Sequence, residues 1–521
     1  MCKCLRSLYI TLRSWFDAVI DFIFSLYWDR KKRPIPDLEK KHEFLTESAT
    51  TLSKRIREKE LKSEDLVAAC IARMKQVNPI INAIVDERYE QALQEARDID
   101  KRIAAGDVTV EEFNLKPYLG VPFTGKECHP VTGLCYTLGL ICRRNERATE
   151  DAECIKLLKQ AGAIPLAVSN LPEFLIWQET RNMVFGQTNN PHHTGRSPGG
   201  SSGGEAALSA TYATTISLCS DLGGSTRMPA FYCGLFGHNP TVGVTNMKGM
   251  LYRKGEEESM LALGFIAKHA EDLAPLTKII CGDKADQLNL DREVDIKDIK
   301  FYYLEESDDL HCSKMRADVK DGMTRVIARL KQECKPIHSP EPYNHEGFNH
   351  MYSLWRYWMT KEPEDFAKWL TNNKGKANAL SELFKKMFCM SEHTMAAIFK
   401  LLDKQVLPQV NAQWAEDMTN KLKQDLFKLL GNNGVLLFPS GPHVAPYHYS
   451  FFLRPYNFGY WAILNALKCP ATQVPLGVNS AGLPIGIQVV AAPYNDALCI
   501  SVAKYLEKEF GGHIPACKVQ R

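Results

Sequence analysis

Hydrophobic residues recur at helical spacing early in the main body of the chain. Between residues 63 and 74 they return at intervals of four, a pattern that predicts an amphipathic helix with Ser63 as its N-cap. Asn78-Pro79 is expected to stop this helix, because proline cannot continue the hydrogen-bond ladder. Residues 91–102 carry a second helical pattern.

Short apolar runs alternate with the helical patterns. Residues 164–168 and 485–490 are largely apolar and are typical of strands buried on both faces. No repeat of solenoid period is evident. The alternation therefore predicts a layered α/β domain in which helices cover both faces of one sheet.

The N-terminal segment has a different pattern, with one polar and one apolar face. Residues 8–28 are rich in Leu, Ile, Phe, Tyr and Trp, but Arg13, Asp17 and Asp21 interrupt them at intervals of four. At ~100° per residue, these three fall with Ser14 and Ser25 within an arc of about 120°. The segment is predicted to be an amphipathic helix.

This helix is predicted to lie on a membrane surface. As a span it would bring three ionisable groups near mid-bilayer at roughly +2.5 to +3.5 kcal/mol each, against ten apolar residues at roughly −0.3 to −0.6 each. In the interface the charges stay solvated, and the basic run 30–33 meets lipid headgroups. The aromatic residues expected to enter the membrane are Trp15, Phe16, Phe22, Phe24 and Trp28.

Two alternatives to the interfacial helix remain open, a single-pass span and a helix that caps a core or an oligomer interface. The proline-containing segment 33–37 is expected to separate a membrane-associating part, residues 1–34, from the main body, residues 35–521. Cys2 and Cys4 are candidate acylation sites that would add a second anchor.

Residues 310–430 form a mostly helical segment that is unusually aromatic. Small-molecule sites are mostly apolar with few polar groups, so this segment is a candidate cavity wall as well as core. The clustered aromatic residues are Tyr352, Trp355, Tyr357, Trp358, Phe366 and Trp369.

Charge and cysteine content exclude some classes of function. The net charge is +3, from 64 basic and 61 acidic residues, which gives no electrostatic basis for a nucleic-acid partner. The 16 cysteines form no CxxC pair or zinc-finger spacing, which argues against a disulfide scaffold or structural zinc. His192 and His193 are adjacent rather than four apart, so no metal is expected.

Three short motifs in the first half of the chain carry candidate chemistry. Residues 197–204 and 221–227 are Gly/Ser clusters that let backbone N–H groups converge on an anion or a developing oxyanion. Residues 120–127 almost match the phosphate-binding loop, but Glu127 replaces the hydroxyl that would ligate magnesium. What remains is Lys126 in a tight turn with apolar flanks, where desolvation favours a neutral amine.

These motifs resemble the amidase signature family. The matching runs are Gly-Lys-Glu at 125–127, Gly-Gly-Ser-Ser-Gly-Gly-Glu at 199–205 and Asp-Leu-Gly-Gly-Ser-Thr-Arg at 221–227. Ser201 and Ser225 are 24 positions apart, as in that family. The resemblance extends from about residue 40 to the C-terminus, and it implies one mixed, twisted sheet covered by helices on both faces.

The resemblance also implies a catalytic set and no cofactor. Ser225 is the expected nucleophile, Ser201 the proton relay after a cis peptide from Gly200, and Lys126 the base. Ser202 and Asp221 are expected to support them, with Gly200. The backbone N–H groups expected to form the oxyanion hole are those of Leu222, Gly223, Gly224 and Ser225.

Within the family, the chain resembles the fatty-acid amide hydrolase 2-like branch. This implies N-acylethanolamines and primary fatty amides as substrates, with Leu175 as a tentative substrate contact. We expect an intracellular, membrane-associated enzyme, at the endoplasmic reticulum or a lipid droplet, with a homodimer as one option. The alternatives are a glutaminase-type component of a tRNA-dependent amidotransferase and a non-catalytic, lipid-binding member.

Overall fold

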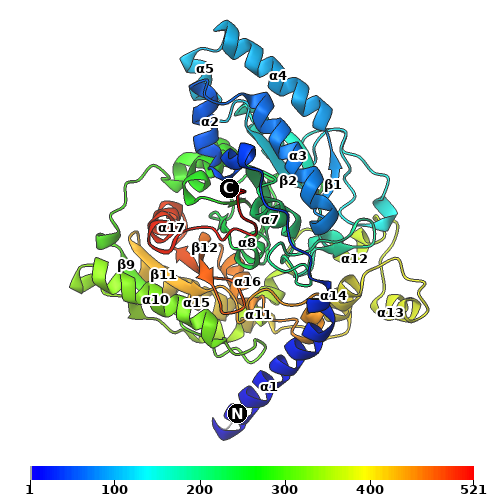
Figure 1. Cartoon of the computed structure of the whole chain (residues 1–521). Coiled ribbons are helices and arrows are strands. Elements are labelled where there is room, and N and C mark those ends of the chain that lie inside the picture. The colour runs from blue at the N-terminus through cyan, green and yellow to red at the C-terminus, as the bar shows by residue number, and fades with distance from the viewer. Residues whose placement is uncertain (1–2) are drawn as a thin grey trace.

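The computed structural model describes residues 3–521, with side chains from Leu8 onward. Its centre is an 11-stranded sheet with the strand order β1-β3-β2-β6-β8-β7-β12-β13-β11-β9-β10 (Figure 1). The strands of this sheet are β1 (Ile84–Glu87), β2 (Pro122–Lys126), β3 (Ile164–Ser169), β6 (Ile216–Asp221), β7 (Phe236–Asn239), β8 (Ala262–Ala267), β9 (Lys300–Tyr303), β10 (Glu341–Pro342), β11 (Gly434–Pro439), β12 (Ala471–Val478) and β13 (Pro484–Ala491). A separate pair joins β4 (Arg181–Asn182) and β5 (Gly186–Gln187).

The sheet is mixed, as predicted. Strands β3, β2 and β6 run parallel to one another, and so do β11, β9 and β10. The strands between these two groups pair antiparallel, and β1 pairs antiparallel with β3. The predicted strands 164–168 and 485–490 are β3 and β13.

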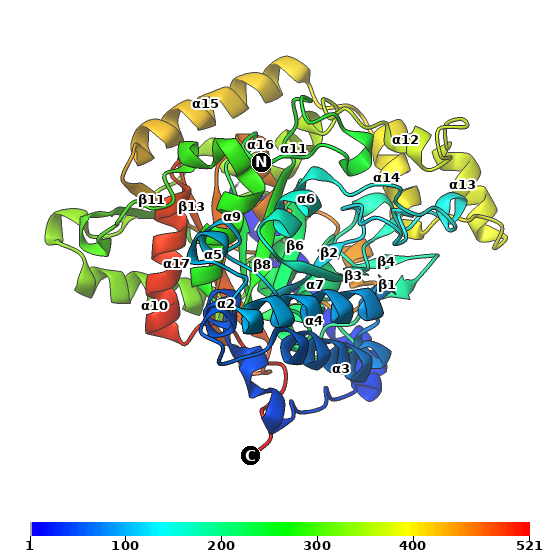
Figure 2. The same ribbon diagram turned by 90° about the horizontal axis from the view of Figure 1, so that it is seen from above.

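Helices lie on both sides of the sheet, with α11 and α15 on one side and α3 and α4 on the other (Figure 2). The N-terminal helices are α1 (Lys3–Trp28), α2 (Ala49–Arg57), α3 (Ser63–Ile81), α4 (Tyr89–Ala105), α5 (Val110–Leu115), α6 (Glu153–Gln160), α7 (Gly203–Ala210), α8 (Arg227–Cys233) and α9 (Leu273–Cys281). The later helices are α10 (Ala317–Glu333), α11 (Met351–Trp358), α12 (Phe366–Trp369), α13 (Ala379–Met387), α14 (Met395–Gln405), α15 (Ala412–Leu430), α16 (Gly459–Leu467) and α17 (Asp496–Phe510).

Strand β11 shows why the sheet is covered on both faces. Val435 and Leu437 belong to the larger hydrophobic core, whereas Leu436 and Phe438 belong to a second core. Successive side chains of a strand point to opposite faces, so each face of β11 meets its own apolar layer.

Helix α3 differs from the prediction at both ends. Ser63 is its first helical residue rather than the cap, and the carboxylate of Asp100 accepts hydrogen bonds from the main-chain N–H groups of Ser63 and Glu64. The helix continues through Pro79 to Ile81, so Pro79 does not stop it. It ends two residues later, where Asn82 takes the left-handed conformation at φ 50°.

Helix α1 projects from the body (Figure 1). Its polar face is the one that docks. Asp17 is buried beside His443, with 3.7 Å between Oδ2 and Nε2. Asp21 accepts a hydrogen bond of 2.6 Å from Arg454, and Arg13 donates to the main-chain oxygen of His311. The face that was predicted to be polar therefore contacts the protein.

The opposite face of α1 is apolar and open. Trp15 is 73% exposed and Phe22 64% exposed, and Leu12, Phe16, Val19, Ile23 and Leu26 are exposed with them. In the described part of the chain, no helix has the length and apolar character needed to cross a bilayer. Cys2 and the side chain of Cys4 lie outside the described residues.

Candidate active site

The sheet brings the predicted motifs to one edge. Lys126 is the last residue of β2, and Asp221 is the last residue of its parallel neighbour β6. The carboxyl ends of parallel strands meet at one edge of a sheet, which is the usual position of α/β active sites. The loop that carries Ser201 leads into α7 beside them.

Lys126 and Ser201 are in direct contact. Lys126 Nζ lies 2.6 Å from Ser201 Oγ and 3.1 Å from the hydroxyl of Ser220. Lys126 is 0% exposed, and no carboxylate among the described residues forms a salt bridge with it. Burial lowers the pKa of Lys126, which favours the neutral amine that a general base requires.

Ser225 lies beside this pair with its side chain partly exposed. Its main-chain carbonyl accepts a hydrogen bond of 3.1 Å from the N–H of Ser202. Among the described residues, no hydrogen bond joins the side chains of Ser201 and Ser225. Both residues line the same pocket, so a substrate there would meet both hydroxyls.

Gly200 allows the chain to pass close to a neighbouring segment. The peptide bond between Gly200 and Ser201 is cis, as the resemblance implied. A Cβ atom at residue 200 would lie 2.4 Å from the carbonyl oxygen of Trp177, so only glycine fits there.

Asp221 shapes the turn that follows β6 and engages one of the four predicted oxyanion donors. The N–H of Gly224 donates to Asp221 Oδ1 at 2.6 Å and is therefore already engaged. A Cβ at Gly224 would lie 2.3 Å from Trp461 Cβ, so no side chain fits at this position. The N–H groups of Leu222, Gly223 and Ser225 have no protein acceptor among the described residues, and these three residues line a pocket.

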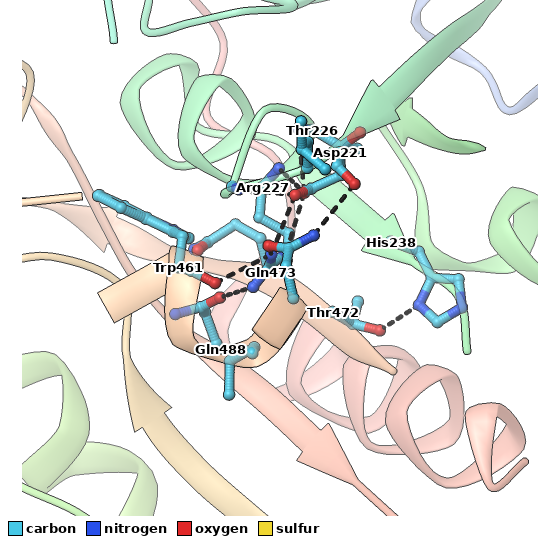
Figure 3. Close-up of polar contacts among 12 residues, drawn as sticks. Asp221, Thr226, Arg227, His238, Trp461, Thr472, Gln473 and Gln488 are labelled. Carbon is cyan, nitrogen blue, oxygen red and sulfur yellow. Dashed lines mark hydrogen bonds and ion pairs between the residues drawn. The ribbon is translucent and has the colours of Figure 1, made fainter. Parts of the chain in front are cut away.

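Arg227 holds Asp221 in place through a buried ion pair. Both side chains are fully buried, and Arg227 Nε lies 3.0 Å from Asp221 Oδ2. The same guanidinium donates to Gln488 and Asn465, each at 2.7 Å, and Figure 3 shows it between Asp221 and Gln488. Burial raises the pKa of Asp221, but Arg227 and the main-chain N–H groups outweigh burial and hold the pKa below its ordinary value.

Two adjoining pockets open at Ser225. The aromatic pocket is lined by Gly223, Trp177, Tyr352, Trp355, Phe399, Tyr456 and Phe458. The charged pocket is lined by Ser201, Phe174, Leu251, Phe366, Arg253, Arg356, Glu362, Glu364 and Lys404. The residues that line both pockets are Leu175, Ile176, Leu222, Ser225, Met359, Lys400 and Asp403.

Part of the predicted cavity wall lines the two pockets. Leu175 lies in the wall that both pockets share, beside Ser225. Of the six clustered aromatic residues, Tyr352, Trp355 and Phe366 line the pockets. Trp358 instead donates to Thr419, and Trp369 stacks on Tyr252, so these two pack within the protein.

Two residues near the site, and one hydrogen bond of a predicted wall residue, were not predicted from the sequence. Ser220 contacts Lys126, and it directly precedes the Asp221 motif, which could have drawn attention to it. Trp355 donates a hydrogen bond to the carbonyl of Leu222, but nothing local in the sequence indicates that pairing. Lys400 reaches the pockets from α14 and belongs to no motif.

Comparison with known proteins shows to which family the chain belongs. The family model described as Amidase matches residues 65–500. The chain belongs to the amidase signature family. It is an amide hydrolase, and its Lys126, Ser201 and Ser225 occupy the motif positions on which the resemblance rested.

Individual members of the amidase signature family match over most of the chain. Human fatty-acid amide hydrolase 2 is 39% identical over 480 residues, which cover 90% of each protein. A component of the glutamyl-tRNA(Gln) amidotransferase of Clostridium acetobutylicum is 28% identical, and the match covers 90% of this chain and 100% of that relative. A solved structure titled "Fatty acid amide hydrolase" superposes with a TM-score of 0.71 at 19% identity, covering 95% of this chain and 89% of its own, and shows that the fold is shared.

Proposed function

We propose that this enzyme hydrolyses fatty-acid amides through an acyl-enzyme formed on Ser225. The observation that carries the proposal is the contact between buried Lys126 and Ser201 at the edge of pockets that Ser225 lines. A neutral lysine can accept a proton through a bridging hydroxyl, and it can return that proton to the leaving amine.

The proposed reaction begins with proton transfer from Ser225 to Ser201 and from Ser201 to Lys126. Ser225 Oγ attacks the amide carbon, and the N–H groups of Leu222, Gly223 and Ser225 stabilise the oxyanion. The proton returns to the nitrogen as the C–N bond breaks, because an amine leaves far more readily than its anion. Water then hydrolyses the ester with the same base. The step between Ser201 and Ser225 requires a hydrogen bond between their side chains. Such bonds in catalytic relays often form or shorten only when substrate is bound.

The lining of the aromatic pocket favours a substrate whose larger part is a long acyl chain. Six aromatic side chains line it, and burial of each methylene is favourable by ~0.8 kcal/mol. The relatives named fatty-acid amide hydrolase 2 are 36–39% identical, which also favours fatty amides.

Helix α1 supports delivery of such substrates from a membrane surface. Its residues Arg13, Asp17 and Asp21 contact the body, while Trp15, Phe22 and their neighbours face outward. A helix with this orientation lowers its free energy by placing the open apolar face in a lipid interface, where no charge has to be buried. We therefore propose a monotopic association through residues 1–34, at an intracellular membrane or lipid droplet.

A substrate panel tests the proposal. In detergent, wild type should hydrolyse oleamide and N-oleoylethanolamine far faster than glutamine, and Ser225→Ala should lose hydrolysis of both fatty amides. Glutamine as the preferred substrate would instead favour the amidotransferase-type function, to which the 28% identical relative points. Failure to hydrolyse any of the three would favour a lipid-binding member without this activity.

A further inference from the structure

Most charged side chains of the charged pocket are paired with one another. Arg253 lies 2.5 Å from Glu364 Oε1 and 3.4 Å from Glu362 Oε2. Glu362 also accepts from the main-chain N–H of Met260 and the hydroxyl of Ser259. Lys404 lies 3.3 Å from Asp365. Arg253 therefore presents no uncompensated positive charge to a ligand. Lys404 shares Asp365 with Lys376, which also lies at 3.3 Å, and Lys404 lines only the charged pocket.

Arg356 is saturated by main-chain acceptors and one carboxylate. Its guanidinium donates to the carbonyl of Pro408 at 2.7 Å and to that of Asp403 at 2.6 Å, and Nε lies 2.9 Å from Asp403 Oδ1. These bonds hold α11 against α14 and the segment that follows it. Arg356 therefore acts as a structural clamp.

Lys400 is the lysine that lines both pockets. Its side chain is 15% exposed, and its only hydrogen-bond acceptor among the described residues is Asp403 Oδ2 at 3.0 Å. An ammonium has three N–H donors, so two remain for a ligand. Asp403 is shared, because it also pairs with Arg356 and accepts from the hydroxyl of Tyr352 at 2.8 Å.

The electrostatic balance at this point is positive. Two cations with little exposed side chain, Lys400 at 15% and Arg356 at 12%, share the single carboxylate of Asp403. The ring of Trp355 also lies 5.1 Å from Lys400 Nζ. Burial lowers the pKa of Lys400, Asp403 raises it, and Arg356 and Lys404 lower it further, so the net shift is downward. A second carboxylate near Lys400 would favour its charged form.

The position of Lys400 shows which part of the substrate would reach it. Lys400 lines both pockets, as Ser225 does, so it lies where the pockets meet rather than at the far end of either. With the acyl chain in the aromatic pocket, the group nearest this junction is the one attached to the amide nitrogen.

We propose that Lys400 binds an acidic group on the amine half of the substrate, so that N-acyl amino acids are preferred over neutral fatty amides. This inference rests on the proposed fatty-amide hydrolysis. The reaction adds one water molecule, breaks the C–N bond and releases a fatty acid and a free amino acid. Lys400 is a binding residue and takes no part in proton transfer.

The test compares two substrates that differ mainly in charge, N-oleoylglycine and N-oleoylethanolamine. Wild type should have the higher kcat/KM for N-oleoylglycine. Lys400→Met should lower that value about ten-fold or more, as expected for loss of a charge-assisted hydrogen bond, and should change the value for N-oleoylethanolamine much less. Lys400→Arg should retain the preference. Lys385→Met is the matched control, because Lys385 also has one carboxylate partner, Glu382 at 2.6 Å, but lies on α13 outside the pockets.

Oleamide hydrolysis by the same preparations separates this inference from the proposed function. If oleamide is hydrolysed but Lys400→Met leaves the ratio of the two kcat/KM values unchanged, the inference is wrong and the proposed function stands. If wild type hydrolyses no fatty amide, both are wrong. If Lys400→Met does not fold, the two compounds can compete with fluorophosphonate labelling of wild type. Stronger protection by N-oleoylglycine supports the inference, and equal protection overturns it.

Discussion

The indole nitrogen of Trp355 donates a hydrogen bond of 2.9 Å to the main-chain carbonyl of Leu222. This bond joins α11, in the aromatic segment, to the turn that carries Ser225. An oxyanion hole works only if its N–H groups are held in place before the reaction. Trp355 therefore links the wall of the substrate pocket to the orientation of the proposed oxyanion donors.

Trp355→Phe should lower kcat by roughly ten-fold, because loss of this bond frees the Leu222 peptide to rotate. Steady-state kinetics with oleamide measures the effect. Trp358→Phe is the matched control, since it loses a similar bond of 3.0 Å to Thr419 that lies away from the pockets. Equal kcat values for the two variants would show that Trp355 does not position the turn.

Lys126→Ala should lower amide hydrolysis by about 10²–10⁴-fold, the range for loss of a general acid–base group. An ester with the same acyl chain should lose less, because an alcohol leaves with less need of a proton. The base must be neutral and burial lowers the pKa of Lys126, so wild-type activity should rise with pH along a limb whose midpoint lies below 10.5. A pH–rate profile with the same limb in Lys126→Ala would contradict the assignment.

Asp221→Asn should destabilise the protein strongly. It leaves Arg227 buried without its counter-charge, a change that costs about 3–5 kcal/mol in comparable buried pairs. The folded-state pKa of Asp221 is lowered. The contribution of Asp221 to the free energy of unfolding is therefore full above about pH 4, and it is lost as the pH falls through that lowered pKa. Thermal unfolding at neutral pH should show a large drop in Tm. Asp98→Asn, which removes an exposed partner of Lys101, should change Tm little.

A double substitution, Trp15→Glu with Phe22→Glu, should reduce co-sedimentation with phospholipid vesicles several-fold while leaving hydrolysis in detergent unchanged. It places charges on the open face of α1, which then cannot enter the interface. Leu115→Glu is the control, because Leu115 is 78% exposed on α5. Equal vesicle binding by the double variant and the control would remove the membrane role of α1.

Local patterns predicted much of this molecule. The periodicity of residues 63–74 and the apolar runs at β3 and β13 depend on neighbours in sequence, and all three are present. The predicted end of α3 was wrong, because the helix continues through Pro79 and ends only where Asn82 takes the left-handed conformation. The helix start was misassigned because its cap, Asp100, comes from another helix.

In the candidate site, too, the residues of local motifs were predicted, and the contacts between distant segments were not. Lys126, Ser201 and the Asp221 turn were found because each belongs to a short motif. Gly224 was expected to donate to the oxyanion, but the sequence does not reveal that Asp221 already accepts its N–H. Trp355 was expected in the aromatic wall, but its bond to Leu222 and the approach of Lys400 come from helices more than a hundred residues away from Ser225, and only the folded chain brings these groups together. The docked orientation of α1 likewise depends on Asp17 and Asp21 meeting partners beyond residue 440.

Mapping the fluorophosphonate adduct by peptide mass spectrometry tests the central claim most directly. The account predicts a single adduct on Ser225 in wild type, no adduct in Ser225→Ala, and much slower labelling in Lys126→Ala. An adduct on Ser201 or another residue, or labelling of Ser225→Ala at the wild-type rate, would contradict it.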